Sequence, residues 1–262
     1  MRSSNGTGGA GERSEEVIVF PDREEMGREA AAAFARWASE AVRGGGRFAA
    51  ALSGGATPRP LYRSLAGSPF REAIPWKGVH LFWGDERCVP PDHPDSNYRM
   101  AYETWISKVP IPLENVHRMK GEEDPKAAAD EYEEQLRAFF GSAGWPAFDL
   151  ILLGVGVDGH TASLFPGSSV LNQQRRWVAA PYVEKLKTHR LTLTLPVLNH
   201  ARRVLFLAAG EEKAEIMKTI LITDPAEVPL PARLIEPRHG RRLFFLDQTA
   251  AAWMNRKRGD DR

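Results

Sequence analysis

The run FDLILLGVG at residues 148–156 constrains the fold more than any other segment of the chain. It is continuously apolar and ends in glycines, which is typical of a strand that is buried on both faces of a parallel sheet. Shorter apolar runs that also predict strands lie at residues 17–20, 47–52, 79–84, 203–210 and 241–247. Helix-like segments separate most of these runs. The alternation predicts an α/β fold, Rossmann-like, with a mostly parallel sheet and helices on both faces.

Turn and capping residues place the main helices. Asp22 is a suitable N-cap for the helix that follows it, and the glycines at 44–46 are expected to end that helix. Further helices are predicted from about Pro58, over residues 125–140, and after each of the last two strands. The alternating segment RLTLTL at 190–195 predicts a half-exposed strand, antiparallel to its neighbour.

The first residues differ in composition from the rest of the 262-residue chain. Residues 1–15 are rich in Gly, Ser and charge, and we expect a flexible tail there, followed by a single domain over 16–262. The tail has no apolar core of a secretory signal, and no run approaches the roughly 20 apolar residues of a membrane span. The lone cysteine, Cys88, cannot form an intrachain disulfide. A cytoplasmic protein, without a membrane segment, is the expectation.

The charge balance bears on possible partners. The 35 basic and 34 acidic residues give a net charge of +1, so bulk attraction to nucleic acid or to an acidic membrane is not expected. Any anionic ligand must therefore be held by a local cluster. The seven histidines show no metal-binding spacing, and one cysteine cannot make a cysteine-based zinc site, so no metal is expected.

The segment AALSGGATP at residues 50–58 interrupts an apolar run with Ser53, Gly54 and Gly55. Adjacent glycines are kept where side chains would obstruct the backbone. One interpretation is a tight turn. The other is a loop whose backbone N–H groups meet an anion at the start of the next helix. The loop itself leaves both interpretations open.

The glycine-bearing turns at 53–55, 84 and 154–159 follow predicted parallel strands and should meet at one edge of the sheet, where α/β proteins bind ligands. Asp158 lies in the last turn and His160 directly follows it; their side chains, two residues apart in an extended loop, could reach one pocket. Histidine is the commonest general base near neutral pH. The alternative is a capping aspartate and a structural histidine before a helix that starts near Thr161.

Cationic residues follow other strand ends. Asp85, Glu86 and Arg87 come directly after the strand that ends at Gly84, either as a solvated loop or with Arg87 facing a phosphate or an oxyanion. Cys88 beside them is expected to be a packing residue, because no base is evident near it. Arg190 opens a strand. Lys213 lies in the first turn of a helix, where a cation is unfavourable unless an anion binds there.

Four blocks of the sequence together resemble the 6-phosphogluconolactonase family, which shares its fold with glucosamine-6-phosphate deaminase and ribose-5-phosphate isomerase. The blocks are LSGGATPRPLYRSL, FWGDERCVPPDHPDSNYRM, DLILLGVGVDGHTASLFPG and HRLTLTLPVLNHARRVLFLAAGEEKA. They occur in family order and span nearly the whole chain after the tail. The third block is the most specific.

The resemblance implies hydrolysis of 6-phospho-D-glucono-1,5-lactone in the oxidative pentose phosphate pathway. It implies that His160 is the general base, that Asp158 orients the site or assists proton transfer, and that Arg87 lies near the substrate. The residues implied around the substrate and its phosphate are Ser53, Gly54, Gly55, Thr57, Asp85, Arg190 and Lys213. The partner is then a small sugar phosphate. No organic cofactor or metal is expected, and the chain is expected to be a monomer or a weak homo-oligomer.

Two other functions have to be weighed. Glucosamine-6-phosphate deaminase shares the Asp-Gly-His element but carries an acidic residue five positions after the histidine, where this chain has Phe165, which cannot transfer protons. The deaminase also has an acidic base in the block that matches Gly84–Arg87, for which Asp85 could substitute. A non-catalytic sugar-phosphate sensor would need no Asp158 or His160 and would carry a DNA-binding segment, which a 15-residue tail is too short to hold.

Overall fold

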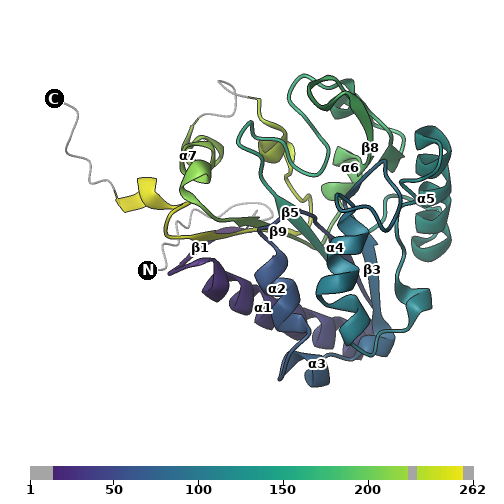
Figure 1. Ribbon diagram of the computed structural model, residues 1–262, viewed down its shortest axis with the longest axis horizontal. Coiled ribbons are helices and arrows are strands. Elements are labelled where there is room, and N and C mark those ends of the chain that lie inside the picture. Colours follow the sequence, from purple (N-terminus) through teal and green to yellow (C-terminus); the bar gives the residue numbers. More distant parts are fainter. Residues whose placement is uncertain (1–13, 224–228, 256–262) are drawn as a thin grey trace.

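The computed structural model describes residues 14–223 and 229–255, and it is built around a six-stranded parallel sheet (Figure 1). In spatial order the strands are β1 (Ser14–Phe20), β10 (Arg241–Asp247), β9 (Arg203–Ala208), β5 (Leu150–Gly154), β2 (Phe48–Leu52) and β3 (Val79–Trp83). All five neighbouring pairs are parallel. The sequence-based prediction of a mostly parallel sheet is therefore confirmed, and each of the six apolar runs forms a strand.

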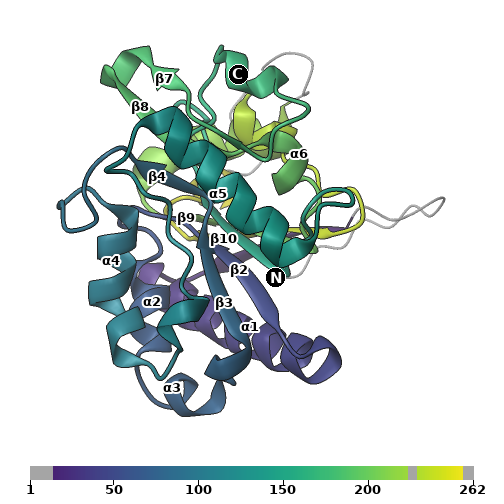
Figure 2. The ribbon, with the colours of Figure 1, turned by 90° about the vertical axis from the view of Figure 1, so that its right-hand side faces the viewer.

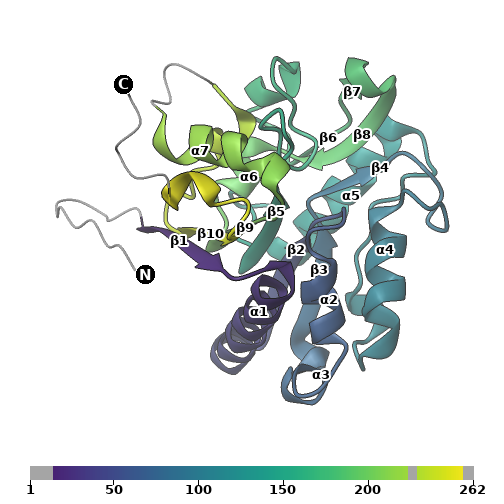
Figure 3. The same ribbon diagram turned by 60° about the vertical axis from the view of Figure 1, so that its left-hand side comes forward.

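Helices cover both faces of this sheet, as expected (Figures 1 and 3). On one face lie α1 (Arg23–Gly45), α2 (Arg59–Leu65), α3 (Phe70–Ala73) and α4 (Asn97–Thr104). On the other face lie α5 (Pro125–Phe140), α6 (Leu195–Leu198) and α7 (Ala214–Ile222). Short 3-10 turns lie at Trp76–Gly78, Ile106–Lys108, Leu113–Asn115, Ser169–Asn172, Glu184–Leu186, Glu211–Lys213, Pro231–Leu234 and Ala252–Asn255.

Helix α1 begins and ends where its capping residues predict. The Asp22 carboxylate accepts a hydrogen bond from the backbone N–H of Glu25 at 2.8 Å, which satisfies one of the first N–H groups of the helix. Gly46 ends the helix in the left-handed conformation, with φ of 77°. Alanines dominate the buried face between these caps, so the helix axis packs close to the sheet.

The structure also contains a small antiparallel sheet. Strand β8 (Thr188–Leu193) pairs with β4 (Asp85–Arg87), β6 (Val178–Ala179) and β7 (Tyr182–Val183). The β7–β8 hairpin projects beyond one end of α5 in Figure 2. The interpretation of Asp85–Arg87 as a loop was wrong. These residues form a strand because Glu86 turns inward, where it is 2 % exposed, and β8 completes the backbone hydrogen bonding.

The segment predicted as a strand at 190–195 is antiparallel where it lies in β8, which ends at Leu193 and is followed by α6, but it is not half-exposed. Thr192 and Thr194 are both fully buried, opposite the buried Leu191 and Leu193. Their hydroxyls are satisfied internally, since Thr194 Oγ1 donates to the Arg176 carbonyl at 2.7 Å and Thr192 Oγ1 donates to the Leu193 carbonyl at 3.0 Å. A threonine can be buried when its hydroxyl donates to a backbone carbonyl. The alternation of residue types in the sequence does not reveal such a bond.

Other boundaries also differ from expectation. No helix starts at Thr161, which instead forms a β-bridge with Leu164, and the next helical turn is Ser169–Asn172. Strand β1 begins at Ser14, inside the segment expected to be a tail, whose residues 1–13 lie outside the described residues. After β10 the described chain contains a 3-10 turn at Ala252–Asn255, and residues 256–262 lie outside it.

The order of the strands places a topological switch point in the sheet. The chain adds β3 on one side of β2, whereas β5, β9 and β10 are added on the other side. The connections that leave β2 and β5 therefore diverge at the carboxyl ends of these strands. In open α/β sheets, a crevice that binds ligands forms outside such a point.

The buried carboxylate of Glu133 ties α5 to the small sheet. The residue is 6 % exposed and accepts hydrogen bonds from Arg176 Nε at 2.7 Å, Arg137 Nη2 at 2.7 Å and the backbone N–H of Trp177 at 3.0 Å. Burial alone would raise the pKa of Glu133, but these hydrogen bonds hold it below its ordinary value. The ionised carboxylate therefore fixes the start of β6, which pairs with β8.

We expect Glu133→Gln to lower the free energy of unfolding by about 1–3 kcal/mol at pH 7, because a charge-assisted acceptor is replaced by a neutral amide. The pKa of Glu133 is depressed by folding, so its stabilisation is present above the unfolded pKa of about 4.3 and is lost as the pH falls through the folded value. The difference between variant and wild type should therefore shrink in acid. Urea denaturation at several pH values measures it. Glu131→Gln, in the exposed pair with Lys120 on the same helix, is the control and should change little.

Candidate active site

The turn after β5 holds Asp158 and His160 in contact. Asp158 Oδ1 forms a short hydrogen bond with His160 Nδ1, and it also accepts from the His160 backbone N–H at 3.3 Å. The second carboxylate oxygen, Oδ2, accepts from Lys185 Nζ at 3.2 Å. The carboxylate thus bridges the imidazole and the tip of the β7–β8 hairpin.

Two further contacts fix the imidazole plane. The Phe165 ring stacks on the His160 ring, with the centroids 4.4 Å apart and the planes at 26°. Gly156 lies under the ring, and a Cβ atom there would stand 2.0 Å from His160 Nδ1. Because Nδ1 is bound to Asp158, Nε2 is the ring nitrogen that can act on a bound molecule. Side-chain exposures of 31 % for His160 and 27 % for Asp158 leave the pair accessible.

The electrostatics of the pair favour an ionised carboxylate. Burial raises the pKa of Asp158, but the hydrogen bonds and charge of His160, together with the Lys185 ammonium, outweigh it and lower this pKa to about 2. Asp158 is therefore an acceptor at any pH near neutrality. It holds a proton on Nδ1 and stabilises an imidazolium when Nε2 takes up a second proton.

Asp85 faces the same turn from the small sheet. Its Oδ2 accepts from Ser163 Oγ at 2.7 Å, and its backbone carbonyl accepts from Asn97 Nδ2 at 2.9 Å. The backbone N–H of Ser163 also reaches Thr192 Oγ1 of β8, at 3.3 Å. The face of β4 and β8 that carries Asp85 therefore lies against the loop of His160.

Arg87 and Arg190 stand directly opposite each other on that sheet. Arg87 Nη1 donates to the Asp95 carbonyl at 2.6 Å, and Arg190 Nη1 donates to the His189 carbonyl at 3.1 Å. Burial lowers the pKa of Arg190, and the nearby Arg87 lowers it further. Like charges at opposed positions of an antiparallel pair are destabilising, so this arrangement favours an anionic ligand.

The turn after β2 carries Ser53, Gly54, Gly55 and Thr57. Ser53 is 8 % exposed, its carbonyl accepts from Tyr62 Oη at 2.7 Å, and its Oγ has no hydrogen-bond partner within the described ranges. Gly55 has φ of +86°, a conformation that L-residues rarely adopt. Thr57 is half-buried and lies just before α2, which begins at Arg59 rather than Pro58.

Lys213 lies at the same edge of the sheet. It ends the 3-10 turn Glu211–Lys213 and caps α7, and the turn follows β9, the neighbour of β5. The side chain is half-buried. Cys88, by contrast, is half-buried at the end of β4 with its thiol pKa raised by burial, which suits the packing role expected of it.

Sequence reasoning did not single out Lys185 or Asn97 as site residues, although both contact predicted site residues. Lys185 lies 27 positions from Asp158, and Asn97 lies 12 positions from Asp85. No local pattern joins residues so far apart, and only the pairing of β7 with β8 and the start of α4 bring them to the site. Glu86 belongs to a charged triplet in the sequence, and it proves to be buried beneath that helix.

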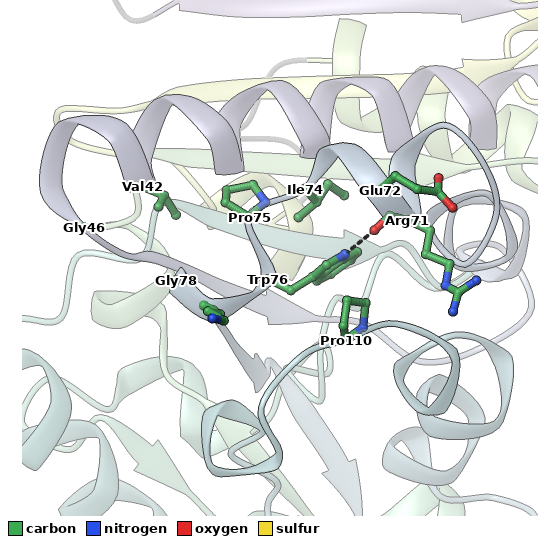
Figure 4. A pocket seen from close by; sticks show the side chains of 10 residues that line it. Val42, Gly46, Arg71, Glu72, Ile74, Pro75, Trp76, Gly78 and Pro110 are labelled. Carbon is green, nitrogen blue, oxygen red and sulfur yellow. Dashed lines mark hydrogen bonds between the residues drawn. The ribbon is translucent and has the colours of Figure 1, made fainter.

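A pocket of about 780 Å³ lies elsewhere, at the opposite edge of the sheet (Figure 4). Gly46 and Gly78, which line it, precede β2 and β3, and Trp76 also lines it, with Nε1 donating to the Arg71 carbonyl at 2.7 Å. The lining is mainly apolar. It shares no residue with the cluster around His160.

Two absences bear on the kind of site. Within residues 14–223 and 229–255, no group of three or more His, Cys, Asp or Glu side chains is placed to hold a metal ion. In the same part of the chain, no helix combines the length and apolar character that crossing a bilayer requires.

An acid–base pair, an opposed pair of arginines and a glycine turn thus follow strands at the carboxyl edge of the sheet, and comparison with known proteins identifies the family. Residues 21–244 match the model of the glucosamine-6-phosphate isomerases/6-phosphogluconolactonase family. A 6-phosphogluconolactonase of Synechocystis sp. is 46 % identical over 215 residues, which cover 81 % of this chain and 87 % of the relative. The chain therefore belongs to this family.

Solved structures agree with the assignment. The 6-phosphogluconolactonase from Trypanosoma cruzi superposes with a TM-score of 0.82 at 30 % identity, covering 93 % of this chain and 98 % of that one. A monomeric glucosamine-6-phosphate deaminase has a TM-score of 0.74 at 22 % identity, covering 91 % and 99 %, which shows a common fold alone.

The opposed arginines lead to a prediction about stability and anion binding. We expect Arg190→Gln to keep or raise the melting temperature, because it removes a repulsion between Arg87 and Arg190. Inorganic phosphate should raise the melting temperature of the wild type and raise that of the variant much less. Thermal unfolding across a phosphate titration measures both. Arg202→Gln, at the exposed opposite edge, is the control and should respond like the wild type. An equal phosphate response in all three proteins would contradict an anion site here.

Proposed function

We propose that this chain hydrolyses 6-phospho-D-glucono-1,5-lactone to 6-phospho-D-gluconate, the second step of the oxidative pentose phosphate pathway. The observation that carries the proposal is the partly exposed His160 imidazole, fixed through Nδ1 by Asp158, on a loop that contacts the small sheet of the two opposed arginines. Opening a phosphorylated lactone needs a base, a donor for the oxyanion and a phosphate site. Relatives named 6-phosphogluconolactonase support the choice of substrate.

In the proposed reaction His160 acts as the general base. Nε2 takes a proton from water as the water oxygen attacks the lactone carbonyl carbon, and the carbonyl becomes an oxyanion. Asp158, ionised because of its low pKa, stabilises the imidazolium that results. The tetrahedral intermediate collapses, the bond from carbon to ring oxygen breaks, and the imidazolium returns the proton to that oxygen. The new carboxylic acid then loses its proton to solvent.

The cations and the glycine turn are assigned to binding. We assign Arg87 to the lactone end, where its guanidinium can donate to the developing oxyanion. The residues assigned to the substrate and its phosphate are Ser53, Gly54, Gly55, Thr57, Asp85, Arg190 and Lys213. The unpartnered hydroxyl of Ser53 and the charge of Arg190 opposite Arg87 support this assignment, because a phosphate could accept from the hydroxyl and offset the charge of Arg190.

Deaminase activity is the less favoured alternative. Proton transfer in that reaction would use an acid five positions after His160, and here the Phe165 ring occupies the position and stacks on the imidazole. A phenyl ring donates no proton. Glucosamine 6-phosphate is therefore expected to bind as a phosphate ester without being turned over.

We further propose a single domain from β1 onward that works in the cytoplasm as a monomer or a weak homo-oligomer. The single cysteine supports a reducing compartment, because structural disulfides mark oxidising ones. Size-exclusion chromatography with light scattering tests the assembly state.

The first test is acid release from freshly prepared 6-phosphogluconolactone. The wild type should exceed spontaneous hydrolysis, and His160→Ala should lower kcat by about 10²–10⁴-fold with KM little changed, because the base is lost and the binding groups remain. Asp158 stays ionised throughout the assay, since its pKa is about 2.

His239→Ala is the matched control, because His239 is exposed and precedes β10 at the opposite edge of the sheet. It should keep full activity. A wild type that does not exceed the spontaneous rate would overturn the lactonase assignment. A wild-type kcat in His160→Ala would be compatible with the lactonase assignment, but it would show that His160 is not the general base.

A further inference from the structure

Asn97 connects two parts of the site that the chain supplies separately. It is the first residue of α4, and it is 2 % exposed. Its Nδ2 donates to the Asp85 backbone carbonyl at 2.9 Å and lies 3.4 Å from Asp85 Oδ1. One amide group therefore holds both the backbone and the carboxylate of Asp85 on strand β4.

The same side chain packs against the glycine turn after β2. A Cβ atom on Gly54 would stand 1.7 Å from Asn97 Oδ1 and 2.2 Å from its Cγ. Gly54 thus lacks a side chain where the Asn97 amide needs the space. The turn and β4 touch the same amide from two sides, so the amide sets the distance between them.

The carboxylate of Glu86 fixes the position of Asn97. Glu86 is buried, and its Oε1 accepts the Asn97 backbone N–H at 2.7 Å while its Oε2 accepts the Tyr98 N–H at 2.8 Å and Ser96 Oγ at 3.2 Å. A carboxylate at the first N–H groups of a helix is a favourable cap. Glu86 follows Asp85 in β4, so strand, helix start and amide form one rigid unit.

We propose that Asn97 is a positioning residue that sets the spacing between the Gly54 turn and Asp85, and so the affinity for the phosphorylated substrate. This inference rests on the proposed function, in which both of these parts contact the substrate. His160 and Asp158 lie on another loop and do not depend on the amide directly. Loss of the amide should therefore weaken binding more than it slows the chemical step.

The test compares Asn97→Ala, Gly54→Ala and the double variant in the lactonase assay. Each single change should raise KM about tenfold or more with kcat within about threefold, because each displaces the same contact. The double variant should be no worse than the poorer single variant, because residues in one contact are not additive. A purely structural role would reduce the folded fraction, and so apparent kcat, and would leave KM unchanged.

Asn97→Asp is the second variant, because it keeps the shape that packs on Gly54 and loses the donor to Asp85. It should fold and still raise KM. Glu103→Ala, on the exposed side of α4, is the control and should leave both constants unchanged. Unchanged KM in Asn97→Ala and Asn97→Asp, or single effects that multiply in the double variant, would overturn the proposal.

The proposal and the proposed function can fail separately. If the wild type does not exceed spontaneous hydrolysis, the lactonase assignment fails, and thermal unfolding of the same variants still tests the contact. The melting temperature lost by the double variant should then be clearly smaller than the sum of the two single losses, because the methyl group added at position 54 fills space that the truncation of Asn97 leaves. Additive losses would show that Gly54 and Asn97 act independently.

Discussion

The parallel pairing of β2 with β5 at the centre of the sheet is the constraint on which the site depends. The pair joins Ala50 to Leu150 and Ala51 to Ile151, and the backbone N–H of Ala49 is satisfied by Asp149 Oδ2 at 2.9 Å. Both strands are buried on both faces, so neither can slip without exposing apolar side chains. Their carboxyl ends therefore lie side by side, and the Ser53 turn and the His160 turn start from fixed points.

The small antiparallel sheet brings the remaining groups to these turns. After β3 the chain passes through Gly84, whose N–H donates to the Leu52 carbonyl at 2.9 Å and whose carbonyl accepts from the Leu193 N–H at 2.8 Å. One residue thus links the end of β2 to β8. Glu86 lies on the buried side of β4, and Asp85 and Arg87 lie on its other side. The cations of the site are held by backbone pairing, so their mutual repulsion is opposed by rigid structure.

Much of the fold could be predicted because it follows from local patterns. Apolar runs, the Asp22 cap and the Gly46 stop depend on residues close in sequence, and these elements occur where expected. Strand β4 could not be predicted, because its three residues are charged and only β8 makes them a strand. Thr192 was misassigned for a similar reason, since the partner that satisfies a buried hydroxyl cannot be read from alternation.

The shared direction of the Asp158 and His160 side chains could be predicted because they are two residues apart in one loop, whereas their contact is known only from the structure. The glycines of the site show how much of its geometry the sequence can predict. A glycine in the sequence indicates that a neighbouring group needs the space of a side chain, but it does not identify that group. Gly156 leaves room for the His160 ring and Gly54 for the Asn97 amide, whereas Gly55 supplies a left-handed conformation. The first two reasons are contacts between side chain and backbone inside the protein, so these residues shape the candidate site before any ligand binds.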